Sequence, residues 1–321
     1  MRQVVCDVLG CIDNLVLREV PPSQATDGHV VVDVEFAAAS FVDTVLVKGL
    51  YQVDYPVPYV PGSAVAGTVS SIGPGVTGVD LGAAVVAALE AAGGFADQVV
   101  VPAEVLIPRP PELAADLAVA SLENYATMTF ALQERARLRS NEWLVVLGAG
   151  GAIGLAAVDI ARFMEANVVA FASSDEKREL ARRAGANIVL GYEDMPSVRD
   201  ITDGGADVVI DPVGGDIARA AVRVLARAGR YCVLGFASGE IPQLPANRIL
   251  FQNRQVIGVD FGDLARRAPM SARAFMASAI GRIARGELQP PQPTRMPLES
   301  AASALNLIAN RKVPGKIVLE M

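Results

Sequence analysis

A glycine-rich turn follows a short apolar run near the middle of this sequence, and its residue types suit phosphate binding. The run, residues 144–147, is typical of a buried parallel strand, and Gly148, Gly150 and Gly151 come directly after it. Glycines at this spacing allow a tight turn and let the backbone approach a pyrophosphate closely. Gly154 lets the next helix pack tightly on the sheet, so that the N–H groups of its first turn face that pyrophosphate. The turn therefore predicts a dinucleotide site.

The sequence departs from the strict glycine pattern at two positions, because Ala149 and Ala152 stand where glycines are common. A lone match to such a pattern is weak evidence, since glycine-rich turns also connect strands to helices in proteins that bind no ligand. A plain β-to-α turn is thus the alternative interpretation of this segment.

Ala172 stands about twenty residues after the turn, at the end of the next predicted strand. In NAD sites a carboxylate near this position hydrogen-bonds the ribose 2′-hydroxyl, and it would repel a 2′-phosphate. Ser173 and Ser174 add hydroxyl groups, and Ser174 could also cap the following helix. Lys177 falls in the first turn of that helix, where the macrodipole disfavours a cation unless an anion is bound. We therefore predict NADPH, the alternative being a surface lysine offset by neighbouring carboxylates.

Three further segments come after predicted strands of the same sheet. Tyr192 follows the third strand and could pack on the adenosine phosphate or hydrogen-bond to it, although a loop tyrosine can also pack on its own neighbours. Residues 211–215 follow the fourth strand and residues 235–239 follow the fifth, and both segments contain glycines. Open α/β sheets bind ligands at the carboxyl ends of their strands, so two such loops at one edge favour a site.

The cysteine and histidine content argues against a zinc site. A structural zinc needs four Cys or His ligands and a catalytic zinc usually needs three protein ligands. This chain has three separated cysteines, Cys6, Cys11 and Cys232, and the single histidine His29, which lies in a turn before a strand. The cysteines form no even-numbered framework and fit a reducing compartment as buried thiols.

The second half of the chain alternates between strands and helices, which predicts an α/β fold with a doubly wound parallel sheet. We predict strands at residues 143–147, 167–172, 188–190, 207–211, 230–235 and 255–259. We predict helices at residues 153–164, 175–184 and 217–228, followed later by helices at 271–285 and 298–309. The last residues, GKIVLEM, read as a strand that must join a sheet.

The first 110 or so residues read as β-rich, with glycine and proline between the strands. We predict strands at residues 30–34, 64–72, 85–88 and 98–101. This pattern indicates a small barrel or a partly open sheet.

Length and composition exclude several classes of protein. At 321 residues the chain suggests two domains, and its hydrophobic content of 52% with a mean hydropathy of +0.36 indicates a large interior. We find no long uncharged apolar stretch and no cleavable leader, so we expect a soluble, cytoplasmic protein. The net charge is −7, and Lys and Arg are scattered rather than arranged in a stripe. Nucleic acid and membrane are therefore not expected as partners.

A resemblance to a known family is carried by VVLGAGGAIGLAAVDIA, SSDEKRELARRAGA, VIDPVGGD, VLGFASGEIP and LPANRILFQNRQVIGV. These stretches resemble the zinc-free quinone oxidoreductases of the medium-chain dehydrogenase/reductase superfamily, most of all the quinone oxidoreductase-like protein 2 group. The segment FVDTVLVKGLYQVDYPVPYVPGSAVAG looks like the substrate-domain part of that family. The resemblance covers nearly the whole chain.

The resemblance implies a GroES-like catalytic domain at 1–119, completed by 259–321, and a Rossmann NADPH-binding domain at 120–258 with the active site between them. It also implies a homodimer or tetramer paired through Rossmann-domain sheet edges. Besides Gly150 and Gly151 of the turn, the family's cofactor contacts would by matching position fall on Thr127, Ala152, Ile153, Ser173, Ser174, Lys177, Tyr192, Val213, Gly235, Phe236, Ala237, Phe261 and Lys316.

The chain departs from the family pattern mainly in its substrate half. Ser40 stands where the family usually has asparagine, Val45 where a tyrosine is frequent, and Ala64 where an acidic residue is common. In zinc-bearing relatives the metal ligands would fall near Ala39 and Ser63, and neither residue can ligate zinc.

Without a Lewis acid, hydride transfer favours a small electrophilic acceptor that delocalises the incoming charge by itself, such as a quinone, a conjugated enone or an enoyl thioester. Tyr51 is the candidate proton donor or oxyanion stabiliser, with a flat apolar pocket wall as the alternative role. Ser40 could hydrogen-bond the nicotinamide ribose or a substrate oxygen, and we expect Asp43 to brace this loop.

Two other functions stay open at this point. An enoyl-thioester (enoyl-CoA) reductase would need a basic patch for the carrier phosphate, and in the amino-terminal half Lys48 stands almost alone. A non-enzymatic NADPH-binding sensor or crystallin-like protein would fit the departures in the substrate half, since a fold does not guarantee a function.

Overall fold

The computed structural model describes residues 1–51, 56–89 and 92–321. The chain divides into two compact units. The first unit contains Met1–Glu123, Met276–Ala284 and Pro291–Met321, and the second contains Asn124–Phe275 and Arg285–Pro290. Within the described ranges, no helix is both long and apolar enough to cross a membrane.

The second unit is built on a six-stranded sheet in which every pair of neighbouring strands is parallel. Its strands are β8 (Trp143–Val146), β9 (Asn167–Phe171), β10 (Ile188–Leu190), β11 (Ala206–Asp211), β12 (Leu225–Val233) and β13 (Gln255–Gly258). Their order is β10-β9-β8-β11-β12-β13, so the direction of winding reverses between β8 and β11. The prediction of a doubly wound parallel sheet is confirmed, and the switch point lies where such sheets bind ligands.

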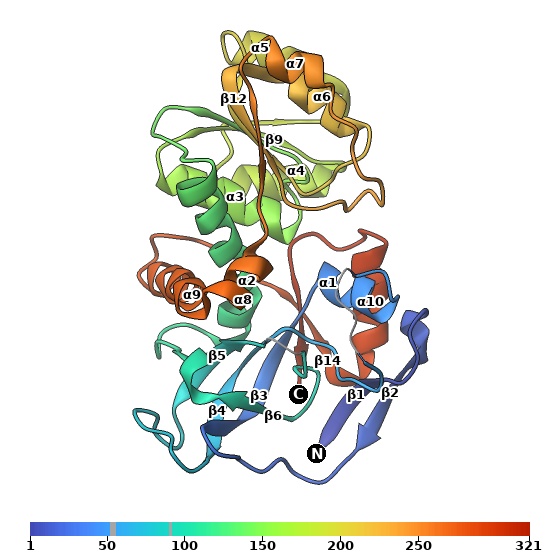
Figure 1. Cartoon of the computed structure of the whole chain (residues 1–321), viewed down its shortest axis with the longest axis vertical. Helices are drawn as coiled ribbons and strands as arrows, with labels where there is room; N and C mark the ends of the chain where they lie inside the picture. Colours follow the sequence, from blue (N-terminus) through green and yellow to red (C-terminus); the bar gives the residue numbers. More distant parts are fainter. Residues whose placement is uncertain (52–55, 90–91) are drawn as a thin grey trace. The chain divides into compact units, whose positions relative to one another are not determined.

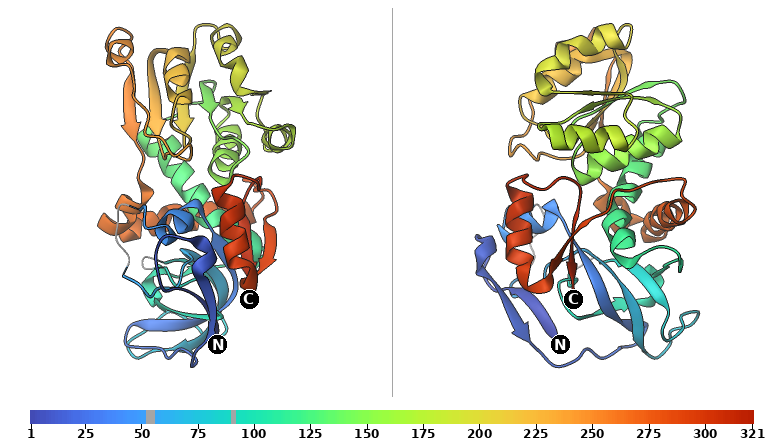
Figure 2. Two further views of the ribbon diagram at one scale, coloured as in Figure 1. Left: turned by 90° about the vertical axis from the view of Figure 1, so that its right-hand side faces the viewer. Right: turned by 180° about the vertical axis from the view of Figure 1, so that it is seen from behind.

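Helices lie on both faces of this sheet (Figure 1, Figure 2). They are α3 (Ala152–Phe163), α4 (Asp175–Arg183), the 3₁₀ segment η4 (Tyr192–Ser197), α5 (Val198–Ile201), α6 (Ile217–Val224) and α7 (Ala246–Leu250). The helix α8 (Phe261–Arg267) follows β13 and lies beside α9 (Pro269–Ala284) (Figure 1). Successive residues of the central strands, such as 144–146, are apolar and fully buried, because both faces of the sheet must pack against helices. The helix α2 (Ala115–Thr129), the π-helical segment η3 (Phe130–Arg135) and α9 complete the helices of this half of the chain.

The first unit contains a seven-stranded sheet and a separate antiparallel pair. The sheet consists of β3 (His29–Ala39), β4 (Ala64–Ile72), β5 (Ala84–Ala88), β6 (Gln98–Pro102), β7 (Ile107–Pro108), β14 (Thr294–Pro297) and β15 (Ile317–Glu320), and the pair of β1 (Arg2–Cys6) and β2 (Leu15–Glu19). The remaining elements are α1 (Phe41–Val47), α10 (Ala301–Ala309) and the 3₁₀ turns η1 (Ile12–Asn14), η2 (Ala103–Val105) and η5 (Leu298–Ser300). The predicted last strand does join a sheet, since Ile317 pairs with Ala39 of β3.

One predicted helix is too long. We expected a helix over residues 217–228, but α6 ends at Val224 and β12 begins at Leu225. Leu225 pairs with Ala206 of β11, and Ala228 adopts a left-handed conformation with φ of +60°. The alanine-rich sequence of this segment favours a helix by intrinsic propensity. Pairing with the buried strand β11 outweighs that weak preference.

Candidate cofactor and substrate site

The glycine turn after β8 is packed so closely that only glycine fits at its far end. A Cβ atom added to Gly154 would lie 2.3 Å from the carbonyl oxygen of Gly148 and 2.5 Å from the Cα of Ala149. Gly148 has a left-handed φ of +63°, which the turn needs in order to reverse towards α3. The first turn of α3 is thereby held against the end of β8, as the sequence predicts.

The amino end of α3 is suited to an anion. Gly151 is its N-cap and contributes no side chain, and Ala152 and Ile153 form the first helical turn and are partly exposed. The N–H groups of a first helical turn have no partner within the helix, and the helix dipole favours negative charge there. This end of α3 therefore has the donors that a pyrophosphate requires.

The segment after β9 brings serine hydroxyls and a lysine to the same turn. Ala172 is buried and carries no charge, while Ser173 is exposed. The hydroxyl of Ser174 accepts a hydrogen bond of 3.3 Å from the backbone N–H of Lys177, which confirms the predicted helix cap. A Cβ atom on Gly150 would lie 2.4 Å from the Cβ of Lys177, so the base of the lysine side chain packs directly on the turn.

Arg178 is a second cation at this place that the sequence reasoning missed. Its guanidinium donates a 3.2 Å hydrogen bond to the carbonyl oxygen of Ala172 and pairs with Asp175 at 2.7 Å. The charged residues from Asp175 to Arg178 indicate the exposed face of a helix. Only the fold shows that the Arg178 side chain reaches back to the carbonyl oxygen of Ala172, just after β9.

Tyr192 joins the turn to the third strand of the sheet. Its hydroxyl accepts a 2.9 Å hydrogen bond from the backbone N–H of Gly148. Its ring stacks on Phe171, with ring centroids 6.0 Å apart and an interplanar angle of 25°. The predicted cofactor residue therefore supports the glycine turn directly.

The loops after β11 and β12 are bound to each other and to the turn. The backbone N–H of Ser238 donates to the carbonyl oxygen of Val213 at 2.8 Å, and Ala237 donates to Pro212 at 3.1 Å. A Cβ on Gly148 would lie 3.1 Å from a methyl carbon of Val213. Gly235 and Phe236, partly exposed, lie in the same loop as Ala237. Three predicted cofactor segments thus form one connected surface at the carboxyl edge of the sheet.

The remaining predicted contacts come from other elements of the chain. Thr127 is a partly exposed residue of α2, and Phe261 begins α8, where its ring packs edge-on against Phe130 and Phe275 at centroid distances of 6.0 and 6.4 Å. Lys316 belongs to the first unit and directly precedes β15.

In the first unit, Ser40 and Asp43 form a capping box at the start of α1. The Ser40 hydroxyl donates to the carboxylate of Asp43 at 2.7 Å and accepts from the Asp43 backbone N–H at 3.2 Å. The other carboxylate oxygen accepts from the N–H of Gly62 at 2.9 Å. Burial raises the pKa of Asp43, against these hydrogen bonds. The Asp43 carboxylate braces the loop, as expected. The Ser40 hydroxyl donates its proton in a hydrogen bond to that carboxylate and cannot donate it elsewhere at the same time.

Tyr51 follows α1 and is exposed, like several apolar residues of the same stretch of sequence. Its side chain is 37% exposed, and those of Leu50, Phe41 and Val42 are 73%, 40% and 38% exposed. The nearest cation along the chain is Lys48, which is also exposed. Residues 52–55, which belong to the same family-like stretch, lie outside the described residues. The stretch of sequence around the candidate proton donor is thus mainly apolar and exposed.

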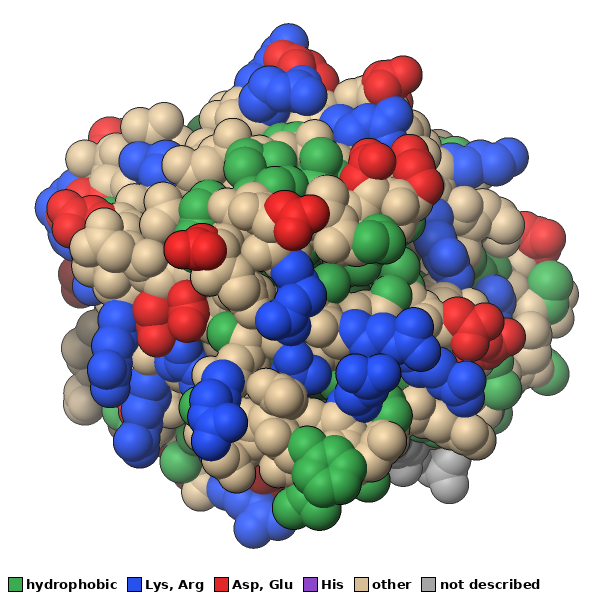
Figure 3. Space-filling view, turned by 90° about the horizontal axis from the view of Figure 1, so that it is seen from above, with side chains coloured by type: hydrophobic (Ala, Val, Ile, Leu, Met, Phe, Trp, Pro, Cys, Tyr) green, Lys and Arg blue, Asp and Glu red, His purple; other side chains and the backbone are tan. Residues whose placement is uncertain are grey.

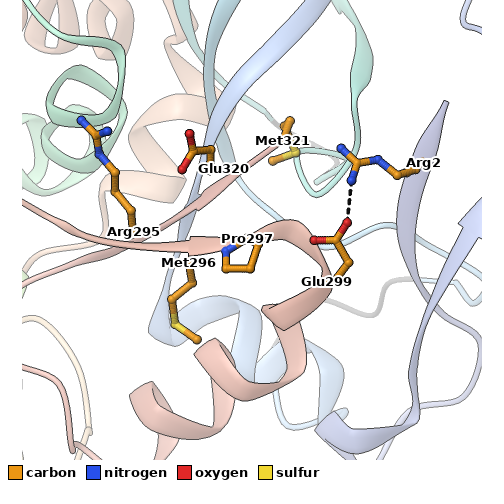
Figure 4. A pocket seen from close by; sticks show the side chains of 7 residues that line it. All are labelled: Arg2, Arg295, Met296, Pro297, Glu299, Glu320 and Met321. Carbon is orange, nitrogen blue, oxygen red and sulfur yellow. Dashed lines mark hydrogen bonds and ion pairs between the residues drawn. The ribbon is translucent and has the colours of Figure 1, made fainter.

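A cavity of about 330 Å³ in the first unit is lined by Arg2, Arg295, Met296, Pro297, Glu299, Glu320 and Met321 (Figure 4). Arg2 and Arg295 line it, but Arg2 pairs with Glu299 at 2.5 Å and with Asp97, and Arg295 pairs with Asp116 at 2.7 Å. Its cations thus already have carboxylate partners. A second cavity of about 400 Å³ in the second unit is lined by Gly215, Asp216, Arg219, Glu240, Ile241, Pro242 and Gln243, beside the loops after β11 and β12.

Metal-ligating residues do not gather in the described part of the chain. Among residues 1–51, 56–89 and 92–321, no group of three or more His, Cys, Asp and Glu side chains is placed to hold a metal ion. All three cysteines are free thiols; Cys6 and Cys232 are buried as expected, but the expectation is wrong for Cys11, which is exposed just before the turn η1. Burial raises the pKa of Cys232 to about 12, which keeps this thiol protonated and inert.

Two family models match the chain. The family described as "Alcohol dehydrogenase GroES-like domain" matches residues 26–111, and the family described as "Zinc-binding dehydrogenase" matches residues 152–278. Among curated relatives, quinone oxidoreductase-like protein 2 of Bos taurus is 34% identical over 314 residues, which cover 96% of this chain and 89% of that protein.

Solved structures with the same fold cover the entire chain. A probable oxidoreductase from Mycobacterium abscessus has a TM-score of 0.89 and 35% identity, covering 100% of this chain and 99% of its own. The quinone oxidoreductase from Thermus thermophilus, described also in complex with NADPH, has a TM-score of 0.84 and 30% identity, covering 100% of both chains. The GroES-like and Rossmann architecture expected from the sequence is therefore confirmed.

Proposed function

This chain belongs to the quinone oxidoreductase family of the medium-chain dehydrogenase/reductase superfamily, and from that premise we propose that it is an NADPH-dependent reductase of quinones or other conjugated acceptors. The observation that carries the cofactor assignment is the packing of Lys177 on Gly150, beside the uncharged end of β9 at Ala172. Ala172 has no carboxylate to repel a 2′-phosphate, and Lys177, a cation, packs against the glycine turn at Gly150.

The residues present fit NADPH. The N–H groups of Ala152 and Ile153 would hold its pyrophosphate, and Gly150 and Gly151 leave the backbone accessible there. Ser173, Ser174 and Lys177, assisted by Arg178, would hold the 2′-phosphate, with Tyr192 supporting the turn beneath. Val213, Gly235, Phe236 and Ala237 would line the side of the nicotinamide, and we assign further contacts to Thr127, Phe261 and Lys316.

When bound, NADPH supplies the hydride, and the chain supplies orientation and a proton. As an enone or quinone takes up hydride, its oxygen gains negative charge. The Tyr51 hydroxyl donates a hydrogen bond and then a proton to that oxygen. Ser40 plays a different part, because its hydroxyl proton is donated to Asp43 and only a lone pair remains to accept from a ribose or substrate hydroxyl.

The charge distribution favours this function over an enoyl-thioester reductase. Exposed Arg199, Arg223 and Arg248 lie near the buried Arg254. Figure 3, viewed from the end with α5, α6 and α7, shows Lys and Arg side chains over that face, with Asp and Glu side chains among them. These residues lie at the amino-terminal ends of β11, β12 and β13. The cofactor loops lie at the opposite edge, so this basic group does not serve a phosphate next to the reacting atoms.

Substitution of Lys177 tests the cofactor assignment. In Lys177→Met, we expect the affinity for NADPH to fall roughly 10- to 100-fold, because a charge-assisted contact to the 2′-phosphate is lost, while NADH affinity is unchanged. Methionine keeps the methylene packing on Gly150. Titration of cofactor fluorescence measures both dissociation constants. Arg183→Met is the control, since Arg183 is an exposed cation of the same helix that pairs with Glu179. An unchanged NADPH preference in Lys177→Met would place the phosphate elsewhere.

Turnover separates the three candidate functions. We expect the chain to oxidise NADPH in the presence of a benzoquinone or a conjugated enone, and to do so more slowly with crotonyl-CoA, because the stretch of sequence before Tyr51 exposes apolar residues and only one cation, Lys48. A strong preference for crotonyl-CoA would support the enoyl-thioester reductase. Tight NADPH binding without oxidation by any of these acceptors would support a sensor or crystallin-like protein.

We also assign a homodimer interface to the edge strand β13. This strand pairs only with β12 in the described sheet, and Val256 is 43% exposed, with Leu250 and Phe251 just before it at 69% and 72%. An open strand with apolar neighbours is a template for pairing. We expect Phe251→Glu with Val256→Glu to sediment as a monomer, whereas Leu81→Glu, an equally exposed leucine of the first unit at 68%, keeps the wild-type mass. A wild-type monomer would refute the assignment.

A further inference from the structure

Asp211, the last residue of β11, is a buried carboxylate that organises the loop after it. Its side chain is 1% exposed. One carboxylate oxygen accepts hydrogen bonds from the backbone N–H groups of Val213 at 2.7 Å and Gly214 at 2.8 Å. The other oxygen accepts a hydrogen bond from the hydroxyl of Tyr231 in β12. Both strands belong to the second unit, so a single carboxylate ties the start of one cofactor loop to the neighbouring strand.

The hydroxyl of Tyr231 is suited to donate a hydrogen bond to Asp211 permanently. It is fully buried, and burial followed by the negative charge of Asp211 raises the pKa of its hydroxyl. The hydroxyl therefore stays protonated, and the carboxylate keeps a donor at both of its oxygens.

The loop that Asp211 holds has little rigidity of its own. Gly214 and Gly215 adopt left-handed φ angles of +69° and +66°, which glycine visits freely in both hands. Yet the loop connects three cofactor segments: Val213 packs on Gly148, its carbonyl accepts from Ser238, and the N–H of Gly215 donates to Glu240 at 3.0 Å. The position of Val213 thus depends on the hydrogen bonds that the N–H groups of Val213 and Gly214 donate to Asp211.

We propose that Asp211 and Tyr231 are a positioning pair that sets Val213 and its loop for the dinucleotide. Neither residue needs to touch the cofactor, because both act through the backbone of residues 212–215. The inference rests on the proposed function for its ligand, since Val213 is assigned there to the nicotinamide side. Without the Tyr231 hydroxyl, one buried carboxylate oxygen loses its donor, and the carboxylate can turn away from Val213 and Gly214 to find another.

A second buried Tyr–Asp pair in the same unit provides a matched control. The hydroxyl of Tyr125 donates to Asp159 at 2.9 Å, and both side chains are nearly as buried, at 3% and 1% exposure. Asp159 also accepts from the N–H of Gln289 and pairs with Arg162. This pair ties α2, α3 and the segment Arg285–Pro290 together and holds none of the loops after β11 and β12.

The test compares Tyr231→Phe with Tyr125→Phe in the full chain. We expect both variants to lower the melting temperature by similar amounts, because each loses one buried hydrogen bond. Only Tyr231→Phe should weaken NADPH binding, roughly tenfold by calorimetry in the absence of an acceptor, and speed amide hydrogen exchange at Val213 and Gly214. Equal NADPH affinity in Tyr231→Phe, Tyr125→Phe and the wild type would overturn the proposal.

Substitutions of Asp211 keep the test decisive if Tyr231→Phe folds poorly. In Asp211→Asn the amide oxygen still accepts from Val213 and Gly214, and its NH₂ group donates to the Tyr231 oxygen, so NADPH affinity should stay within about threefold of the wild type. Asp211→Ala should lose at least as much affinity as Tyr231→Phe; wild-type affinity in this variant would also overturn the proposal. A wild type that binds no NADPH would instead refute the proposed function, while hydrogen exchange at Val213 and Gly214 would still test the pair.

Discussion

Gly154→Ala is expected to abolish NADPH binding and to destabilise the second unit by about 3 kcal/mol. The added Cβ would overlap the carbonyl oxygen of Gly148 at 2.3 Å and the Cα of Ala149 at 2.5 Å. Both are backbone atoms of the turn, so no side chain can rotate to make room. The start of α3 must move away from the sheet, and the N–H groups proposed to hold the pyrophosphate move with it.

The effect of Gly154→Ala is measured by thermal unfolding and by fluorescence titration with NADPH. Gly258→Ala is the control, because no atom lies within 4 Å of a Cβ added there and its backbone is not left-handed. We expect this control to bind NADPH like the wild type. A Gly154→Ala variant that keeps its melting temperature and its NADPH affinity would show that the turn is looser than its geometry indicates.

Tyr51→Phe is expected to lower kcat for a conjugated enone about 100-fold, with the dissociation constant for NADPH unchanged. Phenylalanine keeps the ring and its apolar surface but has no proton to give to the developing enolate. Because Tyr51 is exposed and follows α1 rather than packing in the core, its hydroxyl can be removed without cost to folding. Steady-state kinetics at saturating NADPH give kcat and KM separately.

Tyr51→Ala separates the donor role from the role of an apolar wall. If the ring only lines the pocket, Tyr51→Phe will match the wild type, whereas Tyr51→Ala will raise KM for the acceptor. If the hydroxyl is the donor, both variants will lose kcat to a similar degree. Ser40→Ala provides a further contrast, since loss of the helix cap should cost about 1 kcal/mol of stability.

Local sequence patterns were enough to predict much of the fold and part of the candidate site. The strands 64–72 and 188–190 were predicted with the bounds that the structure has, because apolar runs between turn residues mark buried strands. The cap at Ser174 was predicted from its place before a charged helix, and the structure confirms it. The helix α1 was missed, although Ser40 and Asp43 stand three residues apart in the spacing of a capping box.

Contacts between residues that follow or belong to different strands could not be predicted in the same way. The hydrogen bond from Gly148 to Tyr192 joins residues 44 positions apart, and Tyr231 reaches Asp211 from 20 positions away. Such partners meet only because the strand order places β12 next to β11 and β10 next to β9. No residue type or spacing in the chain marks either pair.

The sequence by itself determined the glycine turn, the uncharged position at Ala172 and the alternation of strands and helices, because these follow from local backbone freedom, charge and periodicity. Only the tertiary structure decided that Lys177 packs on Gly150, that Gly62 donates a hydrogen bond to Asp43, and that Tyr231 donates one to Asp211. These contacts join segments distant along the chain, and their geometry is set by strand order and close packing rather than by any local preference.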